Sequence, residues 1–356
     1  MISNLRKAIS AGRKIIVFGA GGFGARTIKV LEQNKIQIAA VCDNSPEKQN
    51  KKFCGYDVLA ADVLRGMDSI VVVAVQYPKE IIEQLKGWGI NSIVYCKELL
   101  LELHEQYEKL VFPNFDNPQV SIVLTAYNEW KYTYECLKSI LNTKTNIEYE
   151  IIVGDNASTD ETKDIEKYVE NIRVIHRDEN IGYLRNCNET AKTAKGKYMV
   201  LMQNDTKIIS DNWLDHWVNI CEKEQSIGAV SGVAYWWDMD QNAMDYGAAI
   251  GENGDLTAND RLEGICDVEY ITPACICFRT DVWREMGGFD ERYVPAWFED
   301  IDLYCSMREH GYRLVLDTDT FFMHYREITA PQENVMSIIQ QNRQKYLEKW
   351  NHLIQE

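Results

Sequence analysis

Residues 120–129 have the sequence VSIVLTAYNE, an apolar run that ends in the polar cluster Tyr127-Asn128-Glu129. Two later apolar runs end in the same way, at Asp155-Asn156 and at Asn204-Asp205. Apolar runs of this length predict buried parallel strands. In open α/β sheets, ligands bind beyond the carboxyl ends of such strands. The pattern therefore predicts a binding site at one edge of an α/β sheet.

A fourth polar cluster, Glu299-Asp300-Ile301-Asp302, lies much further along the chain. Transfer from an activated phosphate donor needs a carboxylate to take the proton of the incoming hydroxyl. It also needs positive charge on the leaving diphosphate, and hard cations prefer oxygen ligands. We expect Asn204-Asp205 to supply the metal contact. We expect Asp300 to be the base, with Glu299 and Asp302 raising its pKa. Taken alone, the fourth cluster also fits a solvated helix face.

The composition excludes several classes of protein. At 356 residues the chain has room for about two domains of roughly 150 residues each. A net charge of −16 without a Lys/Arg block argues against nucleic-acid binding. The ten cysteines are scattered, which indicates free thiols in a reducing compartment. No apolar run is long enough to span a membrane, and the first residues lack a signal-peptide core. We therefore expect a cytoplasmic protein.

Residues 1–105 alternate between strand and helix patterns. This alternation predicts a small Rossmann-like parallel sheet. The expected strands are 14–18, 38–42, 70–75 and 92–96, and the expected helices are 25–34, 79–87 and 99–109. Pro113 and Pro118 then break any helix, so residues 106–118 are predicted to be a linker.

A glycine fingerprint, Gly19-x-Gly21-x-x-Gly24, lies between the first strand and the first helix of this unit. Asp43 ends the next strand. This is the context of a dinucleotide site, in which the glycines approach a pyrophosphate and the acidic residue binds a ribose hydroxyl. We predict a nucleotide site here. The alternative is a scaffold that has the glycine turn and binds nothing.

The second unit is predicted to span residues 119–333, with a C-terminal helix within 334–356. Ser158-Thr159-Asp160-Glu161 is a capping-box pattern that predicts a helix start. Apolar residues at helical spacing in 334–353 predict a helix that packs on the body of the protein, the alternative being a face for a partner or a membrane. Residues 234–266 are rich in aromatics and glycines, which favours either acceptor recognition or a packed insertion.

Residues 120–326 resemble the inverting family 2 glycosyltransferases with the GT-A fold. The resemblance is closest to bacterial enzymes of surface-polysaccharide synthesis, rhamnosyltransferases among them. Its motifs occur in order along the chain, at residues 121–129, 151–160, 180–183, 204–205, 287–291 and 297–302. The resemblance implies an α/β fold with a GT-A nucleotide-diphospho-sugar transferase domain after the Rossmann-like unit.

The resemblance also implies roles for residues at matching positions. The donor-binding residues would be Ala126, Tyr127, Glu129, Asp155, Asn156 and Asn204. Asp205 and His324 would hold Mg²⁺ or Mn²⁺ on the donor diphosphate, although a lone histidine can also be structural. Asp300 would deprotonate the acceptor, supported by Glu299 and Asp302. Arg185 is a candidate phosphate contact, and a solvated helix face explains it equally well.

One position departs from the family pattern. The metal motif is usually Asp-x-Asp, and Gln203 stands at its first position. Asp205 together with the diphosphate and water can still satisfy Mg²⁺, which takes only one or two carboxylates in many sites. The substitution predicts weaker metal binding, and an inactive protein that only binds its ligand remains an alternative.

The sequence thus predicts an inverting glycosyltransferase. It would move a sugar from a nucleoside-diphosphate donor to a saccharide hydroxyl, with a lipid-linked acceptor and peripheral attachment to the inner face of the cell membrane left open. Two alternatives remain: a noncatalytic nucleotide-sugar-binding protein and an NAD-dependent sugar oxidoreductase. The donor sugar, acceptor, linkage and oligomeric state are not readable from the sequence.

Overall fold

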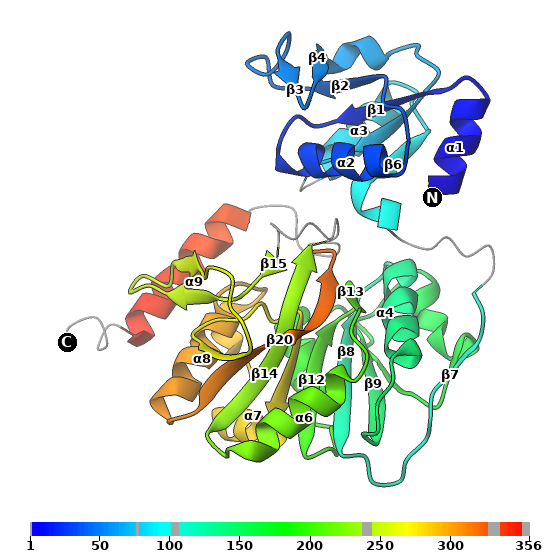
Figure 1. The fold of residues 1–356 in the computed structure, drawn as a ribbon. Helices are drawn as coiled ribbons and strands as arrows, with labels where there is room; N and C mark the ends of the chain where they lie inside the picture. The colour runs from blue at the N-terminus through cyan, green and yellow to red at the C-terminus, as the bar shows by residue number, and fades with distance from the viewer. Residues whose placement is uncertain (1, 76–77, 101–106, 237–243, 327–334, 351–356) are drawn as a thin grey trace. The chain divides into compact units, whose positions relative to one another are not determined.

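The computed structural model describes residues 2–75, 78–100, 107–236, 244–326 and 335–350 (Figure 1). The chain divides into two compact units, residues 1–105 and 106–356. Both units are mixed α/β structures whose main sheets are rich in parallel strand pairs. Within the described ranges, no helix combines the length and the apolar character that a membrane crossing requires.

The first unit is built around one six-stranded sheet. Its elements are α1 (Ile2–Ser10), β1 (Lys14–Phe18), α2 (Gly22–Gln33), β2 (Ala40–Asp43), β3 (Lys52–Phe53), β4 (Tyr56–Ala60), the 3-10 helix η1 (Ala61–Leu64), β5 (Ser69–Val73), α3 (Lys79–Gly87), β6 (Ile93–Tyr95) and the 3-10 helix η2 (Cys96–Leu100).

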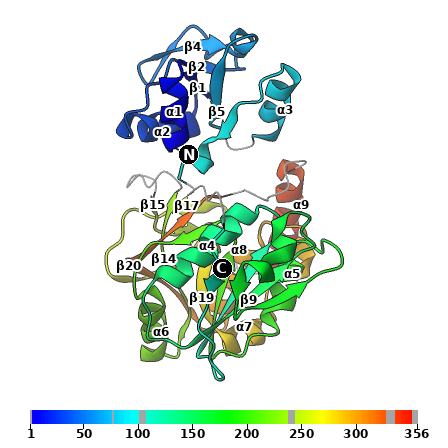
Figure 2. The ribbon, with the colours of Figure 1, turned by 90° about the vertical axis from the view of Figure 1, so that its right-hand side faces the viewer.

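The strand order in this sheet is β3-β4-β2-β1-β5-β6, and every pair from β4 to β6 is parallel. The parallel sheet predicted for this unit is thereby confirmed. Parallel strands are covered on both faces, and Figure 2 shows α2 and α3 on opposite faces of the sheet. Alternate residues of β1 and β5, such as Phe18 and Val73, pack with Leu85 of α3 in one buried cluster.

The second unit contains a larger, ten-stranded sheet and two small two-stranded sheets. Its elements are β7 (Leu110–Val111), β8 (Val120–Ala126), α4 (Trp130–Asn142), β9 (Tyr149–Asp155), η3 (Glu161–Lys167), β10 (Val169–Glu170), β11 (Arg173–His176), α5 (Tyr183–Ala191), β12 (Tyr198–Gln203), β13 (Thr206–Ile208), α6 (Trp213–Lys223), β14 (Ile227–Trp236), β15 (Met244–Asp245), β16 (Ala248–Ile250), β17 (Leu256–Ala258), β18 (Ile265–Val268), β19 (Cys275–Arg279), α7 (Thr280–Met286), η5 (Glu291–Tyr293), α8 (Glu299–Glu309), β20 (Arg313–His324) and α9 (Val335–Trp350).

The main strand order of the large sheet is β11-β9-β8-β12-β19-β14-β20-β13. The first four strands are parallel, so their carboxyl ends meet at one edge. β12 and β19 are antiparallel, whereas β14 and β20 are again parallel. The long strand β20 carries the chain back toward β13, and His324 lies opposite Thr206 in that pairing.

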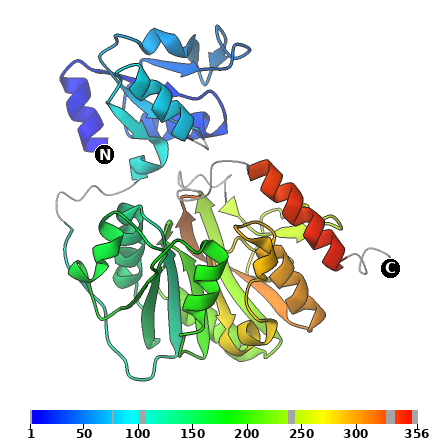
Figure 3. The same cartoon turned by 180° about the vertical axis from the view of Figure 1, so that it is seen from behind.

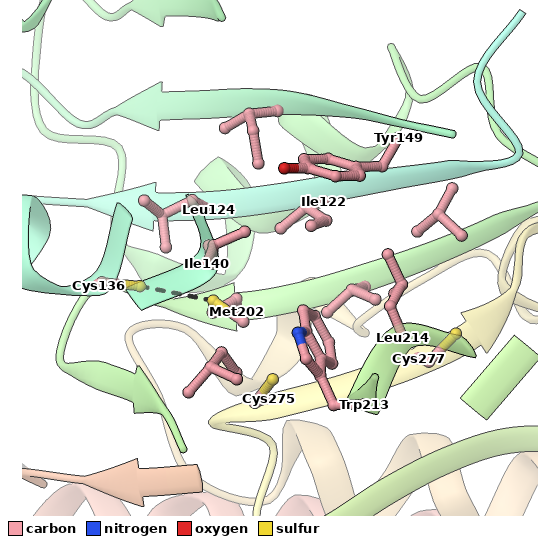
Figure 4. Packing of buried hydrophobic residues seen from close by; sticks show 14 of the residues in the cluster. Ile122, Leu124, Cys136, Ile140, Tyr149, Met202, Trp213, Leu214, Cys275 and Cys277 are labelled. Carbon is pink, nitrogen blue, oxygen red and sulfur yellow. Dashed lines mark hydrogen bonds between the residues drawn. The ribbon is translucent and has the colours of Figure 1, made fainter. Parts of the chain in front are cut away.

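Two hydrophobic cores cover the two faces of this sheet. Helices α4 and α6 pack on one face, where Trp213 and Leu214 meet alternate residues of β8 such as Ile122 and Leu124 (Figure 4). Helices α5, α7, α8 and α9 pack on the other face (Figure 3). Because successive side chains of a strand point to opposite faces, Val123 belongs to this second core.

Two local expectations need correction. The capping box does not start at Ser158: the helix there is the 3-10 helix η3, whose cap is Asp160, with its side chain accepting the Thr162 N–H at 3.0 Å. Ser158 is used elsewhere, since its Oγ accepts the Asn128 N–H at 2.8 Å. The helix expected over 99–109 is absent at residues 107–109, which lead into β7. Its residues 101–106 lie outside the described ranges.

The C-terminal helix is present as α9, and the flanking residues 334 and 351–353 lie outside the described ranges. Tyr346 and Trp350 are buried in the core that also contains α8. The prediction that this helix packs on the body is confirmed.

Candidate active site

A cavity of about 740 Å³ lies beyond the carboxyl ends of β8, β9 and β12. Further walls come from the start of α8, the end of β20, the connection between β16 and β17, and α9. The cavity brings together most of the candidate donor, metal and catalytic residues predicted from the sequence. Those that line it are Ala126, Tyr127, Asn156, Asn204, Asp205, Glu299, Asp300 and His324.

The loops after β8 and β9 are fastened to each other at this edge. Asn128 and Glu129 both have a positive φ, at 53° and 57°. Such residues are uncommon and need support from their surroundings. The support comes from Asn128, whose N–H donates to Ser158 and whose side-chain oxygen accepts the Thr159 N–H at 2.7 Å. These two hydrogen bonds hold the turn, in which Tyr127 lines the cavity and Glu129 occupies the N-cap position of α4.

Asp155 and Asn156 face different surroundings although they are neighbours. Asp155 is 2% exposed, and its carboxylate accepts the Ser158 N–H at 3.0 Å and contacts Nδ1 of His176 at 2.8 Å. Asn156 lines the cavity and holds the next loop, since its side-chain oxygen accepts the Ile181 N–H at 2.9 Å. Glu129 and Asp155 are not among the described residues that line the cavity. Their contacts to the donor stay predictions.

The candidate metal ligands Asp205 and His324 lie together at the end of β12 and β20. Nε2 of His324 is 3.4 Å from Oδ1 of Asp205, and both residues are buried. Among the described residues, this Nε2 has no hydrogen-bond partner. A buried, unsatisfied ring nitrogen beside a carboxylate is a donor set that suits a divalent cation. No group of three or more possible protein ligands occurs within the described ranges, so substrate oxygens and water would complete the coordination.

Gln203 and Asn204 stabilise the loop that carries Asp205. The Gln203 amide donates to the Tyr183 hydroxyl at 3.3 Å. Both residues line the cavity. The buried Asn204 amide donates to Thr133 Oγ1 on α4 at 2.9 Å. The residue in place of the usual first aspartate is therefore bound to a tyrosine.

Asp300 lies in the first turn of α8 and is buried. Its Oδ2 accepts the Tyr270 hydroxyl at 2.8 Å, and its Oδ1 accepts the Ile301 N–H at 2.8 Å. Burial raises the pKa of the Asp300 carboxyl, and the bonds from Tyr270 and Ile301 offset only part of this rise. A raised carboxyl pKa suits a general base that works near neutral pH. Tyr270 also lines the cavity, and no sequence motif pointed to it.

Glu299 stands beside Asp300 and is also buried. Burial, followed by the charge of Asp300, raises the pKa of Glu299 well above its usual value. Its Oε2 has no hydrogen-bond partner among the described residues. Burial therefore favours the protonated form of Glu299, next to the candidate base.

Asp302, the third carboxylate of this cluster, faces away from the cavity. Its Oδ1 accepts bonds from Tyr293 at 3.0 Å and from Trp350 Nε1 at 2.8 Å, and its Oδ2 pairs with Lys349 at 2.7 Å. The structure thus places Asp302 as an anchor between α8 and α9. Its predicted influence on the base remains a prediction.

The basic residues that line the cavity differ from the one that the sequence predicted, Arg185. Arg185 is half-exposed on α5, pairs with Glu291 at 3.0 Å, and does not line the cavity. Arg326 and Arg343 do line it. Arg326 follows His324 by only two positions, a proximity that could have marked it. Arg343 comes from α9, a segment that carries no motif.

The glycine fingerprint of the first unit folds as a strand–turn–helix. Gly19 has a φ of +121°, and a Cβ on Gly24 would lie 1.9 Å from the Gly19 oxygen, so both glycines are required by the turn itself. A Cβ on Gly21 would meet nothing within 4 Å. Asp43 is used inside the unit, because its Oδ2 accepts the Ala20 N–H at 2.7 Å and pairs with Lys48 at 3.1 Å. The nucleotide site at this turn remains a prediction.

Comparison with known families agrees with this geometry. Residues 121–285, which lie within the second unit, match the family model described as Glycosyl transferase family 2. Residues 11–93 match a second model, described as C2185-like, N-terminal.

Several curated proteins are similar to parts of this chain. The O-antigen biosynthesis protein RfbC of Myxococcus xanthus is 24% identical over 60% of this chain and 18% of its own length. The poly(ribitol-phosphate) beta-glucosyltransferase of Bacillus spizizenii is 36% identical over 32% of the chain and 19% of its own length. An uncharacterized glycosyltransferase of Haemophilus influenzae is 33% identical over 54% of the chain and 61% of its own length. The chain thus spans about a fifth of the first two relatives and less than two thirds of the third.

A solved structure supports the fold. The crystal structure of GalNAc-T7 with UDP, GalNAc and Mn²⁺ matches with a TM-score of 0.51 at 13% identity, covering 63% of this chain and 48% of that one. The GT-A fold predicted for the second unit is confirmed.

Proposed function

We propose that the chain is an inverting glycosyltransferase that moves a sugar from a nucleoside-diphosphate donor to a saccharide hydroxyl. A single arrangement supports this proposal: Asp205, His324 and the buried Asp300 line one cavity at the carboxyl ends of the parallel strands. The relatives named for O-antigen and poly(ribitol-phosphate) chemistry favour an acceptor in surface-polysaccharide synthesis.

The strand-end residues form the donor side in this proposal. Ala126, Tyr127 and Asn156 line the part of the cavity where a nucleotide would lie. Asp205 and His324 would hold Mg²⁺ or Mn²⁺ on the diphosphate. The bound cation supplies compensation for the negative charge that develops on the leaving group.

The acceptor would enter on the side of α8 and α9. Gly254, Asp255 and Leu256 line this part of the cavity, within the segment predicted to recognise the acceptor. Asp300 would take the proton of the acceptor hydroxyl as its oxygen attacks the anomeric carbon, while the bond to the diphosphate breaks. A single in-line displacement of this kind inverts the anomeric centre.

The test is a screen of UDP-, GDP- and dTDP-sugars with Mn²⁺ and neutral or lipid-linked saccharide acceptors. Release of nucleoside diphosphate is followed, and the product anomer is assigned by NMR. We expect turnover with one donor, an inverted product, and a loss of about 10²–10⁴-fold in Asp300→Asn, the usual contribution of a general base. Donor binding without turnover would overturn the catalytic proposal in favour of a binding protein. Substrate-linked NAD(H) oxidation or reduction would favour an oxidoreductase.

A further inference from the structure

The loop before α8 has an unusual backbone. Trp297 and Phe298 are consecutive non-glycine residues with φ of 73° and 76°. Both line the cavity and directly precede Glu299 and Asp300. A left-handed conformation in a bulky aromatic residue costs free energy and persists only where the surroundings enforce it. The local sequence offers no glycine to relieve it.

The enforcing contacts come from Asn342 on α9. This side chain is 1% exposed. Its Nδ2 donates to three carbonyl oxygens of the loop, those of Tyr293 at 2.8 Å, Ala296 at 2.8 Å and Trp297 at 3.1 Å. An amide nitrogen carries two hydrogens, so one of them is shared between two of the carbonyls.

A lysine on the next turn of α9 fixes the orientation of this amide. Lys345 Nζ donates to Oδ1 of Asn342 at 2.8 Å and also to the Arg292 carbonyl at 2.6 Å. An ammonium group can only donate, so Oδ1 must face Lys345 and Nδ2 must face the loop. The amide therefore has one orientation in which all its partners are satisfied.

A second connection from α9 holds α8 itself. Lys349 and Trp350 both donate to Asp302, which lies in the first turn of α8 together with Asp300. α9 thus contacts both the loop before Asp300 and the first turn of α8, which carries Asp300. It lies beyond residue 285, where the match to the family model ends.

We propose that Asn342 is a positioning residue for the active site, whose amide fixes the 293–298 loop so that Asp300 and Trp297 stand at the cavity. The inference rests on the proposed function for its catalytic consequence, but its structural part can be measured without substrate. Asn342 acts through the loop and does not itself line the cavity.

The test uses the full chain and three substitutions of Asn342, of which Asn342→Asp is isosteric. Asn342→Asp keeps the size and shape of the side chain but places an acceptor against three carbonyl oxygens, whereas Asn342→Ala only removes the donors. Asn342→Gln retains the amide on a longer stem. Leu347→Ala is the matched control, since Leu347 lies on the same helix and packs against the same core.

The first readout is hydrogen exchange of residues 293–301, measured by mass spectrometry. We expect faster exchange there in Asn342→Ala, faster still in Asn342→Asp, and partial restoration in Asn342→Gln. Leu347→Ala should leave these residues protected. Wild-type exchange in both Asn342→Ala and Asn342→Asp would overturn the proposal, whatever the protein's activity.

The second readout is kinetic and uses whichever donor turns over in the screen described above. A misplacement of about 1 Å can lower a rate about 10²-fold. We expect a loss of that order in the kcat of Asn342→Asp, with the KM for the donor nearly unchanged. In Asn342→Ala, which adds no charge, the acid limb of the pH–rate profile should move to lower pH, because water that reaches Asp300 would lower its raised pKa. An equal loss of kcat in Leu347→Ala at equal thermal stability would reduce Asn342 to a packing residue. Absence of turnover in the wild type would instead contradict the proposed function and leave the exchange result to decide the inference.

Discussion

Nε2 of His324 lies 3.4 Å from Oδ1 of Asp205, and this ring nitrogen makes no hydrogen bond within the described residues. Both side chains are buried, His324 at the end of β20 and Asp205 directly after β12. Leaving a buried nitrogen unsatisfied costs free energy. A divalent cation between the two groups would use both as ligands and remove that cost.

Replacing His324 by alanine should therefore weaken Mn²⁺ binding in the presence of a nucleoside diphosphate. We expect the Mn²⁺ affinity to fall by about tenfold or more. Loss of a residue that only hydrogen-bonds to a metal ligand already has an effect of this size. Free Mn²⁺ can be counted by electron paramagnetic resonance during a titration. His216→Ala is the control, because His216 pairs with Asp317 and does not line the cavity. Equal Mn²⁺ affinity in the two variants would remove His324 from the site.

Tyr270 should set the pH at which the base loses its proton. The hydrogen bond from Tyr270 lowers the pKa of Asp300 against the larger raising effect of burial. In Tyr270→Phe the pKa of Asp300 should therefore be higher still, and the acid limb of the pH–rate profile should move to higher pH. Tyr304→Phe is a suitable control, since the Tyr304 hydroxyl donates to the Ile271 carbonyl. An unmoved limb in Tyr270→Phe would mean that a group other than Asp300 controls it.

Glu299 should reduce the stability of the fold above acidic pH. Its pKa in the folded protein is raised well above the usual value, chiefly by burial. Below the pKa of the unfolded chain, both states are protonated and the residue makes no difference. As the pH rises, the unfolded state ionises first, so stability falls until the folded pKa is reached.

Glu299→Gln should therefore raise the melting temperature at about pH 8 and have little effect near pH 4, below the carboxyl's unfolded pKa. Glu309→Gln, an exposed position on the same helix, is the control. A melting temperature that is unchanged at both pH values would contradict the raised pKa of Glu299.

His176 should stabilise the second unit at acidic pH. Burial of the ring disfavours its charged form, but the hydrogen bonds to Asp155 and Glu166 outweigh this, so the pKa of His176 is raised. The stabilisation is then complete below the unfolded pKa of about 6.5 and is lost as the pH rises through the raised value. Its side chain is 40% exposed, so we expect less than about 1 kcal/mol. Urea unfolding of His176→Gln at several pH values would show it, and a pH-independent difference would contradict the ion-pair origin.

The sequence alone was enough to predict those site residues that belong to a local sequence pattern. The strand-end clusters follow their own apolar runs, so Asn156 and Asp205 could be predicted from them. Asp300 could be predicted from the separate acidic cluster at residues 299–302, and the structure brings all three residues to one cavity. Local patterns could not tell that Asp155 points to His176 while its neighbour Asn156 faces the cavity.

The residues that were missed depend on contacts between distant segments. Tyr270 reaches Asp300 from 30 positions away, and Asn342 reaches Trp297 from 45 positions away. Neither belongs to a periodic pattern or a motif, because a tertiary contact leaves no trace in the spacing of one sequence. The same holds for Arg343, whose place at the cavity follows only from the packing of α9.

The glycine turn of the first unit allows a prediction that does not depend on any ligand. A Cβ on Gly24 would lie 1.9 Å from the backbone oxygen of Gly19, so Gly24→Ala must displace the helix from the strand. We expect a destabilisation of about 1–3 kcal/mol, typical of overpacking, measured by thermal unfolding of the full chain. Gly21 has extended backbone angles and open space around the Cβ position, so Gly21→Ala should cost clearly less. Equal losses of stability in the two variants would show that the turn requires a glycine at position 21 as well. A near-silent Gly21→Ala would leave close approach of a ligand as the remaining reason for a glycine at that position.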